Sequence, residues 1–150
     1  MRLAAVMVLA FTTALPAAVK AASADELFQQ FGLFGTWATD CDKAPSPADP
    51  HVSVTTPSPG LVQEDHNLGP GYAVNHYSML SAQRLSDDRL AVEVIFQPGA
   101  ENEQRQKLVF LVRNGTRRTM FNQPEGGEVR VRGGIVLARG SKTPVLKKCE

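Results

Sequence analysis

The stretch "GTWATDC", residues 35–41, sets the first constraint on the fold, because it ends in one of only two cysteines. The other is Cys149, next to last of 150 residues. Two cysteines allow one intramolecular disulfide, which requires the α-carbons of Cys41 and Cys149 to lie within about 7 Å. We therefore expect the start and the end of the domain to be neighbours in space. A reactive thiol is the competing interpretation, but neither cysteine has a CxxC partner.

Residues 1–24 have the pattern of a secretory signal peptide. Arg2 supplies the positive start, "LAAVMVLAFTTAL" is an apolar run of 13 residues, and "ASA" is a small-residue cleavage site before Asp25. The apolar run is too short for a transmembrane helix, which takes roughly 20 residues. We expect a single domain, residues 25–150, in the periplasm or secreted, where cysteines pair, with no membrane insertion after the signal is removed.

The charges of the chain are balanced overall but segregated along it. Removing Arg2 and Lys20 with the signal leaves 16 minus 2, or 14, basic side chains against 15 acidic ones. This balance argues against a nucleic-acid partner. Residues 25–103 carry 12 acids and 3 bases, whereas residues 104–150 carry 3 acids and 11 bases. Acidic early strands lying beside basic late strands would explain the segregation, and a basic binding face is the alternative.

From Gly71 onward the chain alternates strand-like segments with short turns. "NG" at 114–115 predicts a tight hairpin, and Gly133 and Gly134 predict a bulge or a sharp bend. The segments with strand-like alternation are 72–85, 89–97, 104–113, 116–123 and 128–139. Shorter pieces near Trp37, His51 and Leu61 bring the total to seven or eight strands.

The fold class predicted from this pattern is all-β. We expect a seven- or eight-stranded antiparallel up-and-down barrel, in which no strand edge is exposed, and a β-sandwich is the alternative. "SADELFQQFG", residues 23–32, predicts a short N-terminal helix that is capped by Ser23 or Asp25 and ended by Gly32. The segment 45–59 contains five prolines and predicts a long surface loop with at most one edge strand.

Gly35, Thr36 and Trp37 resemble the Gly-x-Trp signature that opens the first strand of lipocalin-like barrels. The resemblance implies that Trp37 plugs the closed end of the barrel and that an arginine from near the last strand packs over it. Arg139 is the first choice for that arginine and Arg132 the second. A disulfide that ties the chain end back to the barrel also fits the resemblance.

A barrel of eight strands is either filled by its own side chains or holds one small ligand. Aromatic and methionine side chains are suited to line such a cavity, and they equally suit a plain hydrophobic core. The side chains predicted to contact a ligand are Tyr77, Met79, Phe96, Phe110 and Met120.

The sequence contains no recognisable catalytic motif. It has no Gly-x-Ser-x-Gly elbow, no HExxH and no phosphate-binding glycine loop. The three histidines, 51, 66 and 76, lack the spacing of a known metal-ligand motif. We therefore expect no enzymatic activity, cofactor or metal. The preferred hypothesis is binding of a small apolar or amphipathic molecule, and the alternative is a protein-interaction or enzyme-inhibitor module that acts through surface loops such as 45–59.

Overall fold

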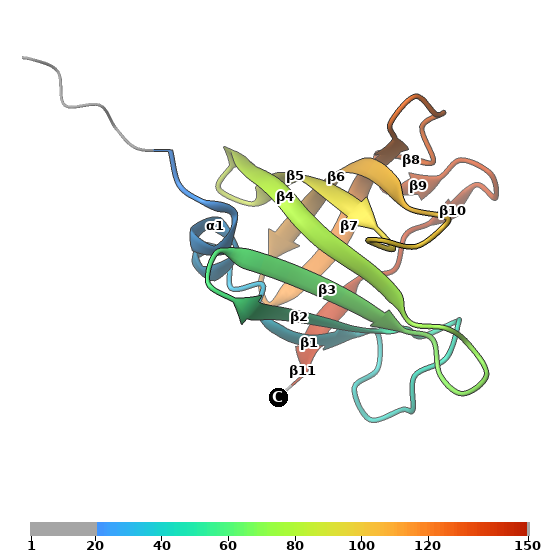
Figure 1. Cartoon of the computed structure of the whole chain (residues 1–150). Coiled ribbons are helices and arrows are strands. Elements are labelled where there is room, and N and C mark those ends of the chain that lie inside the picture. Colours follow the sequence, from blue (N-terminus) through green and yellow to red (C-terminus); the bar gives the residue numbers. More distant parts are fainter. Residues whose placement is uncertain (1–20, 150) are drawn as a thin grey trace, which may run out of the picture.

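The computed structural model describes residues 21–149 (Figure 1). The signal peptide predicted at residues 1–24 lies outside the described residues, apart from 21–24. Among residues 21–149 no helix is both long and apolar enough to cross a bilayer. The elements are α1 (Ala24–Gln30), β1 (Gly35–Ala38), β2 (His51–Ser58), β3 (Leu61–Asn67), β4 (Asn75–Ser86), β5 (Arg89–Phe96), β6 (Gln104–Arg113), β7 (Thr116–Pro124), β8 (Val131–Arg132), β9 (Ile135–Val136), β10 (Ser141–Lys142) and β11 (Leu146–Cys149).

Eight of the strands form a closed antiparallel barrel. Strands β1 to β7 pair in chain order, and β11 fills the remaining gap by pairing with β7 on one side and β1 on the other. The predicted all-β barrel with one short helix is confirmed, and this architecture is consistent with a lipocalin-like fold. The "NG" hairpin is confirmed as well, because Asn114 and Gly115 both adopt positive φ between β6 and β7.

The segment 128–139, predicted as a barrel strand, lies outside the barrel. Its strands β8 and β9, together with β10, extend from β7 as a side branch, which we call the outer hairpin (residues 130–142; Figure 1). The cause is the pair Gly133 and Gly134, whose φ angles of 58° and 75° give a two-residue turn that reverses the chain after only two paired residues. The eighth barrel position is therefore left to β11.

The strand allowed near His51 within the proline-rich segment 45–59 is present as β2, but the prediction that it is an edge strand in a long loop is wrong. This strand pairs with β1 and with β3. Pro57 lies where the register with β3 shifts between Thr55 and Ser58, so its missing N–H costs no regular ladder bond. The connecting loop is confined to residues 39–50.

Helix α1 covers one end of the barrel beside β3 and β4. The backbone N–H of Ser23, within the predicted signal residues 1–24, donates to the Glu26 carboxylate at the start of the helix. Leu27 and Phe28 on its inner face are buried. Trp37 is also buried, and its indole N–H donates to the carbonyl of Leu33, 2.8 Å away. The hydrophobic core therefore lies toward this closed end, and we call the opposite end the mouth.

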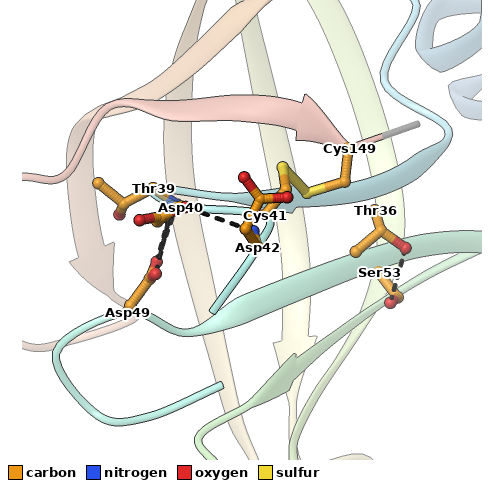
Figure 2. Close-up of a disulfide and its surroundings, with 8 residues drawn as sticks. All are labelled: Thr36, Thr39, Asp40, Cys41, Asp42, Asp49, Ser53 and Cys149. Carbon is orange, nitrogen blue, oxygen red and sulfur yellow. Dashed lines mark hydrogen bonds between the residues drawn. A yellow bond between two sulfur atoms is a disulfide. The ribbon is translucent and has the colours of Figure 1, made fainter. Parts of the chain in front are cut away.

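The predicted disulfide between Cys41 and Cys149 is present, with the α-carbons 5.5 Å apart (Figure 2). The Asp49 carboxylate accepts hydrogen bonds from the backbone N–H groups of Thr39 and Asp40 and so fixes the chain just before Cys41. On the other side, Cys149 pairs with Thr36 of β1. A structural disulfide of this kind indicates a non-reducing compartment.

Removal of the disulfide is expected to destabilise the domain strongly, because it closes a loop of 108 residues. For the Cys41→Ser/Cys149→Ser variant we expect a loss of about 4 to 5 kcal/mol and a fall in Tm of roughly 10–20 °C, measured by calorimetry. Adding reductant to the wild type should reproduce the fall, while the variant serves as the control that no longer responds. A Tm that hardly moves would contradict the role given to this bond.

Candidate functional site

An ion pair crosses the interior of the barrel. Glu64 on β3 and Arg117 on β7 lie 53 residues apart in sequence, and the two terminal guanidinium nitrogens, Nη1 and Nη2, donate to the carboxylate at 2.9 and 3.0 Å. Their side chains are only 4% and 3% exposed. Two parallel hydrogen bonds to one carboxylate satisfy most of the desolvated groups of the pair. The centre of the barrel is thus filled by a charged bridge between opposite walls.

His66 extends this charged cluster toward the mouth. It lies two residues after Glu64 on the same strand face, and its Nε2 is 2.6 Å from the Glu64 carboxylate. The His66 ring contacts Tyr77, with centroids 4.8 Å apart, and Tyr77 contacts Phe96 at 5.1 Å. The His66 side chain is 26% exposed, so this row of rings leads from the ion pair toward solvent.

The surroundings shift two pKa values in this cluster. Burial alone would raise the pKa of Glu64, but the charge of Arg117 and the hydrogen bond of His66 outweigh it and lower the pKa to about 2. Burial, and after it the charge of Glu64, raise the pKa of Tyr77 to about 12. Near neutral pH the interior therefore holds an ionised carboxylate and a protonated phenol.

The arginine that packs over Trp37 is Arg117, so the expectation for Arg139 or Arg132 is wrong. The guanidinium of Arg117 lies 5.9 Å from the centre of the Trp37 ring and 4.5 Å from that of Phe110. Arg132 and Arg139 are exposed in the outer hairpin. The reason is topological, because their segment is not the last barrel strand.

The five side chains predicted to contact a ligand lie in three environments. Met79 and Phe110 belong to the hydrophobic core cluster, where Phe110 lies under Arg117. Tyr77 and Phe96 are paired across β4 and β5 near the mouth. Met120 occupies the register shift in β7. A ligand role for these residues stays a prediction.

A groove of about 770 Å³ lies at the mouth, between the barrel rim and the outer hairpin. Gln104 begins β6 and Pro124 ends β7, so they mark the rim, and Leu137 of the hairpin is 49% exposed. We call this feature the mouth groove. It is lined by Gln104, Pro124, Gly127, Glu128, Val129, Arg130, Val136, Leu137 and Ala138.

Hydrogen-bonded amides connect the mouth groove to the barrel interior. Arg130 donates to the Gln104 side-chain carbonyl at 3.0 Å, and Gln106 donates to the same oxygen at 3.3 Å. Asn122 then donates to Gln106, at 2.8 Å. Gln106 is buried, so these bonds satisfy polar groups that would otherwise be costly inside the barrel. They also fix the rim from which the groove is built.

Sequence reasoning missed both the ion pair and the groove. Period-two alternation in "VQEDH", residues 62–66, could have placed Glu64 and His66 on the same face as the buried Val62. Nothing in the sequence brings Leu137 and Gln104 to one groove, because that arrangement depends on how the outer hairpin folds back. Among residues 21–149 no three histidine, cysteine or acidic side chains gather in a way suited to a metal ion.

Comparison of the chain with protein-family models, curated proteins and solved structures gives no significant match.

Glu64→Gln is expected to lower the free energy of unfolding by about 3–5 kcal/mol near neutral pH, because it leaves the Arg117 guanidinium buried without a counter-charge. The folded-state pKa of Glu64, about 2, lies below its ordinary value of 4.5, so its ionisation contributes stability above pH 4.5 that is lost as the pH falls through this window. The difference between wild type and variant, measured by urea unfolding, should therefore narrow between pH 4.5 and 2.

The matched control is Glu93→Gln, which removes the more exposed pair of Glu93 with Lys107 and should cost less than about 1 kcal/mol. The double variant Glu64→Leu/Arg117→Met should recover most of the free energy of unfolding that Glu64→Gln loses, because it removes both buried charges together. Equal losses for Glu64→Gln and Glu93→Gln, or a loss independent of pH, would contradict the assigned electrostatics.

Proposed function

We propose that the protein is an exported, non-enzymatic β-barrel that binds a small amphipathic molecule in the mouth groove. The observation that carries the proposal is the groove itself, which combines a volume of about 770 Å³ with apolar side chains from Val129, Val136 and Leu137. Pockets that combine apolar walls with a few polar groups are the usual sites for small ligands. Export is supported by the signal-like residues 1–24 and by the disulfide.

The interior of the barrel is a poorer candidate for the ligand site. Trp37, Val62 and Phe110 are at most 1% exposed, and the Glu64–Arg117 pair occupies the space beyond them. A ligand that entered there would have to displace packed side chains and break two charge-assisted hydrogen bonds. A ligand in the mouth groove would displace no packed core side chain and break no ion pair, because the polar groups of the rim are already hydrogen-bonded to one another.

The exposed Leu137 gives the groove its largest solvent-accessible apolar side chain. Exposing half of a leucine to water is unfavourable by roughly 1 kcal/mol, which a ligand chain lying against it recovers. Leu85 on β4 is similarly exposed, at 52% against 49% for Leu137, but lies near the closed end and outside the groove. The two leucines therefore form a matched pair for testing the site.

Titration of the ¹⁵N-labelled protein with 1-decanol, a neutral amphiphile, is expected to shift the amide resonances of Val136 and Leu137. Leu137→Asn should weaken binding about fivefold to tenfold, because it removes an apolar contact worth roughly 1 kcal/mol. Leu85→Asn should leave the affinity unchanged. Absence of binding, equal loss in both variants, or shifts confined to Met79 and Phe110 would contradict the proposed site.

Native mass spectrometry of the protein purified from its own host tests the same function without a chosen probe. We expect an added mass from a co-purifying small molecule, lost on organic extraction and restored by the extract. Protein of unmodified mass that also fails to take up any compound from a lipid and metabolite panel would argue against small-molecule binding. The Leu137→Asn variant, purified in parallel, should carry less of the added mass.

A further inference from the structure

We propose that the ligand of the mouth groove is an anionic single-chain amphiphile, whose head group binds Arg130 and whose chain lies along Leu137. This inference rests on the proposed function and adds the charge of the ligand to it. It is carried by two observations of the outer hairpin: its cations have no carboxylate of residues 21–149 beside them, and one of these cations lies inside the groove.

The outer hairpin holds four basic side chains, Arg130, Arg132, Arg139 and Lys142, and no acidic one. No carboxylate of residues 21–149 lies within 4.0 Å of any of these four groups. In the described part of the chain, only some basic side chains of the barrel strands have an acidic partner. Acidic partners lie beside Lys107, Arg113 and Arg117 at ion-pair distance.

Pairing with acidic side chains therefore explains the charge segregation only in part. Lys107 and Arg113 of β6 lie at ion-pair distance from acids of β5 and the β4–β5 turn, and Arg117 of β7 meets Glu64 of β3 across the barrel interior. The four bases of the outer hairpin have no carboxylate of residues 21–149 at ion-pair distance, and they are all exposed. They raise the local concentration of anions near the groove.

Arg130 is the cation that the groove itself contains. It stands opposite Leu137 in the outer hairpin, where the Leu137 N–H donates to the Arg130 carbonyl at 2.9 Å. Residues opposite each other in an antiparallel pair project their side chains to the same side. A charged head group at Arg130 thus places its attached chain directly beside the exposed Leu137.

The guanidinium of Arg130 is oriented but not saturated. One of its nitrogens donates to Gln104 at 3.0 Å, which holds the group at the barrel rim. A guanidinium has five N–H donors in a planar fork, so donors remain for a carboxylate, phosphate or sulfate oxygen. Glu128 also lines the groove and is exposed, and its charge opposes an anionic ligand. The head group is therefore assigned to the Arg130 side.

The test compares decanoate, decylammonium and 1-decanol, which share one chain and differ in charge. Titrations at about pH 8, where the decanoate carboxyl is ionised, should show decanoate binding about tenfold more tightly than 1-decanol and decylammonium more weakly than either. The preference for decanoate should shrink with added salt. Equal binding of decanoate and 1-decanol, or tighter binding of decylammonium, overturns the inference while leaving the proposed function standing.

Three variants test which residues cause the preference for decanoate over 1-decanol. Arg130→Gln should cost most of the decanoate preference, about fivefold or more, while leaving 1-decanol binding nearly unchanged. Glu128→Gln should strengthen decanoate binding a fewfold, because it removes a repulsive charge. Arg89→Gln removes another exposed arginine, one that lies on β5 outside the groove, and it should change neither affinity. An Arg130→Gln variant that retains the full preference overturns the assignment of the head-group site.

Two further outcomes show whether the proposed function itself fails and whether the anionic group belongs to a free amphiphile or to a membrane surface. If none of the three decyl compounds binds, the proposed function fails and this inference fails with it. Phosphatidylcholine vesicles with and without phosphatidylglycerol test a membrane surface as the source. Binding to the phosphatidylglycerol vesicles in the absence of measurable decanoate binding would overturn the inference, because the cations would then recognise a lipid surface. Decanoate binding that depends on Arg130 and Leu137 supports it, whatever the vesicles do.

Discussion

Closure of the barrel by β11 is the constraint on which the other features depend. This strand has four residues, Leu146–Cys149, yet it must complete the wall by pairing with β1 and β7 at once. The disulfide holds its last residue to the segment that follows β1, which compensates for the small number of ladder bonds that so short a strand can form. The outer hairpin that precedes β11 turns back at Gly133 and Gly134 and is not part of the wall. It lies at the mouth instead, where the groove forms against Gln104 and Pro124.

The barrel interior and the mouth have different roles: the interior stabilises the fold, and the mouth carries the proposed ligand site. Inside the barrel, the guanidinium of Arg117 contacts the rings of Trp37 and Phe110 and also pairs with the Glu64 carboxylate. One side chain thus contributes both to packing and to charge neutralisation. This arrangement fills the barrel and joins opposite walls, which suits a rigid scaffold better than a container. At the mouth, the unpaired cations and the exposed Leu137 present the opposite chemistry. The amide chain from Asn122 through Gln106 to Gln104 fixes the rim between the two regions.

Local patterns in the sequence predicted the local structure well. β6 has its predicted bounds, 104–113, because its alternation is regular and the "NG" turn leaves one way to reverse the chain. The disulfide followed from having two cysteines in a chain whose first residues resemble an export signal. The segment "LKKC" was missed as a strand because four residues carry no readable alternation. Arg117 was missed because the register shift at Met120 and two adjacent arginines hide which face of β7 is inward. The mouth groove is a tertiary feature that sequence periodicity does not encode.

Interstrand nuclear Overhauser effects provide the most direct measurement of the central claim, that the chain end closes the barrel and the outer hairpin lies outside. The structure predicts close backbone contacts of Trp37 with Lys148 and of Thr116 with Lys147. It also predicts that Val131 contacts Asn122 of β7 and Val136 of β9, and that it makes no contact with β1. Contacts between residues 131–136 and β1, with none from residues 146–149, would show that the other segment closes the barrel and would remove the basis for the groove.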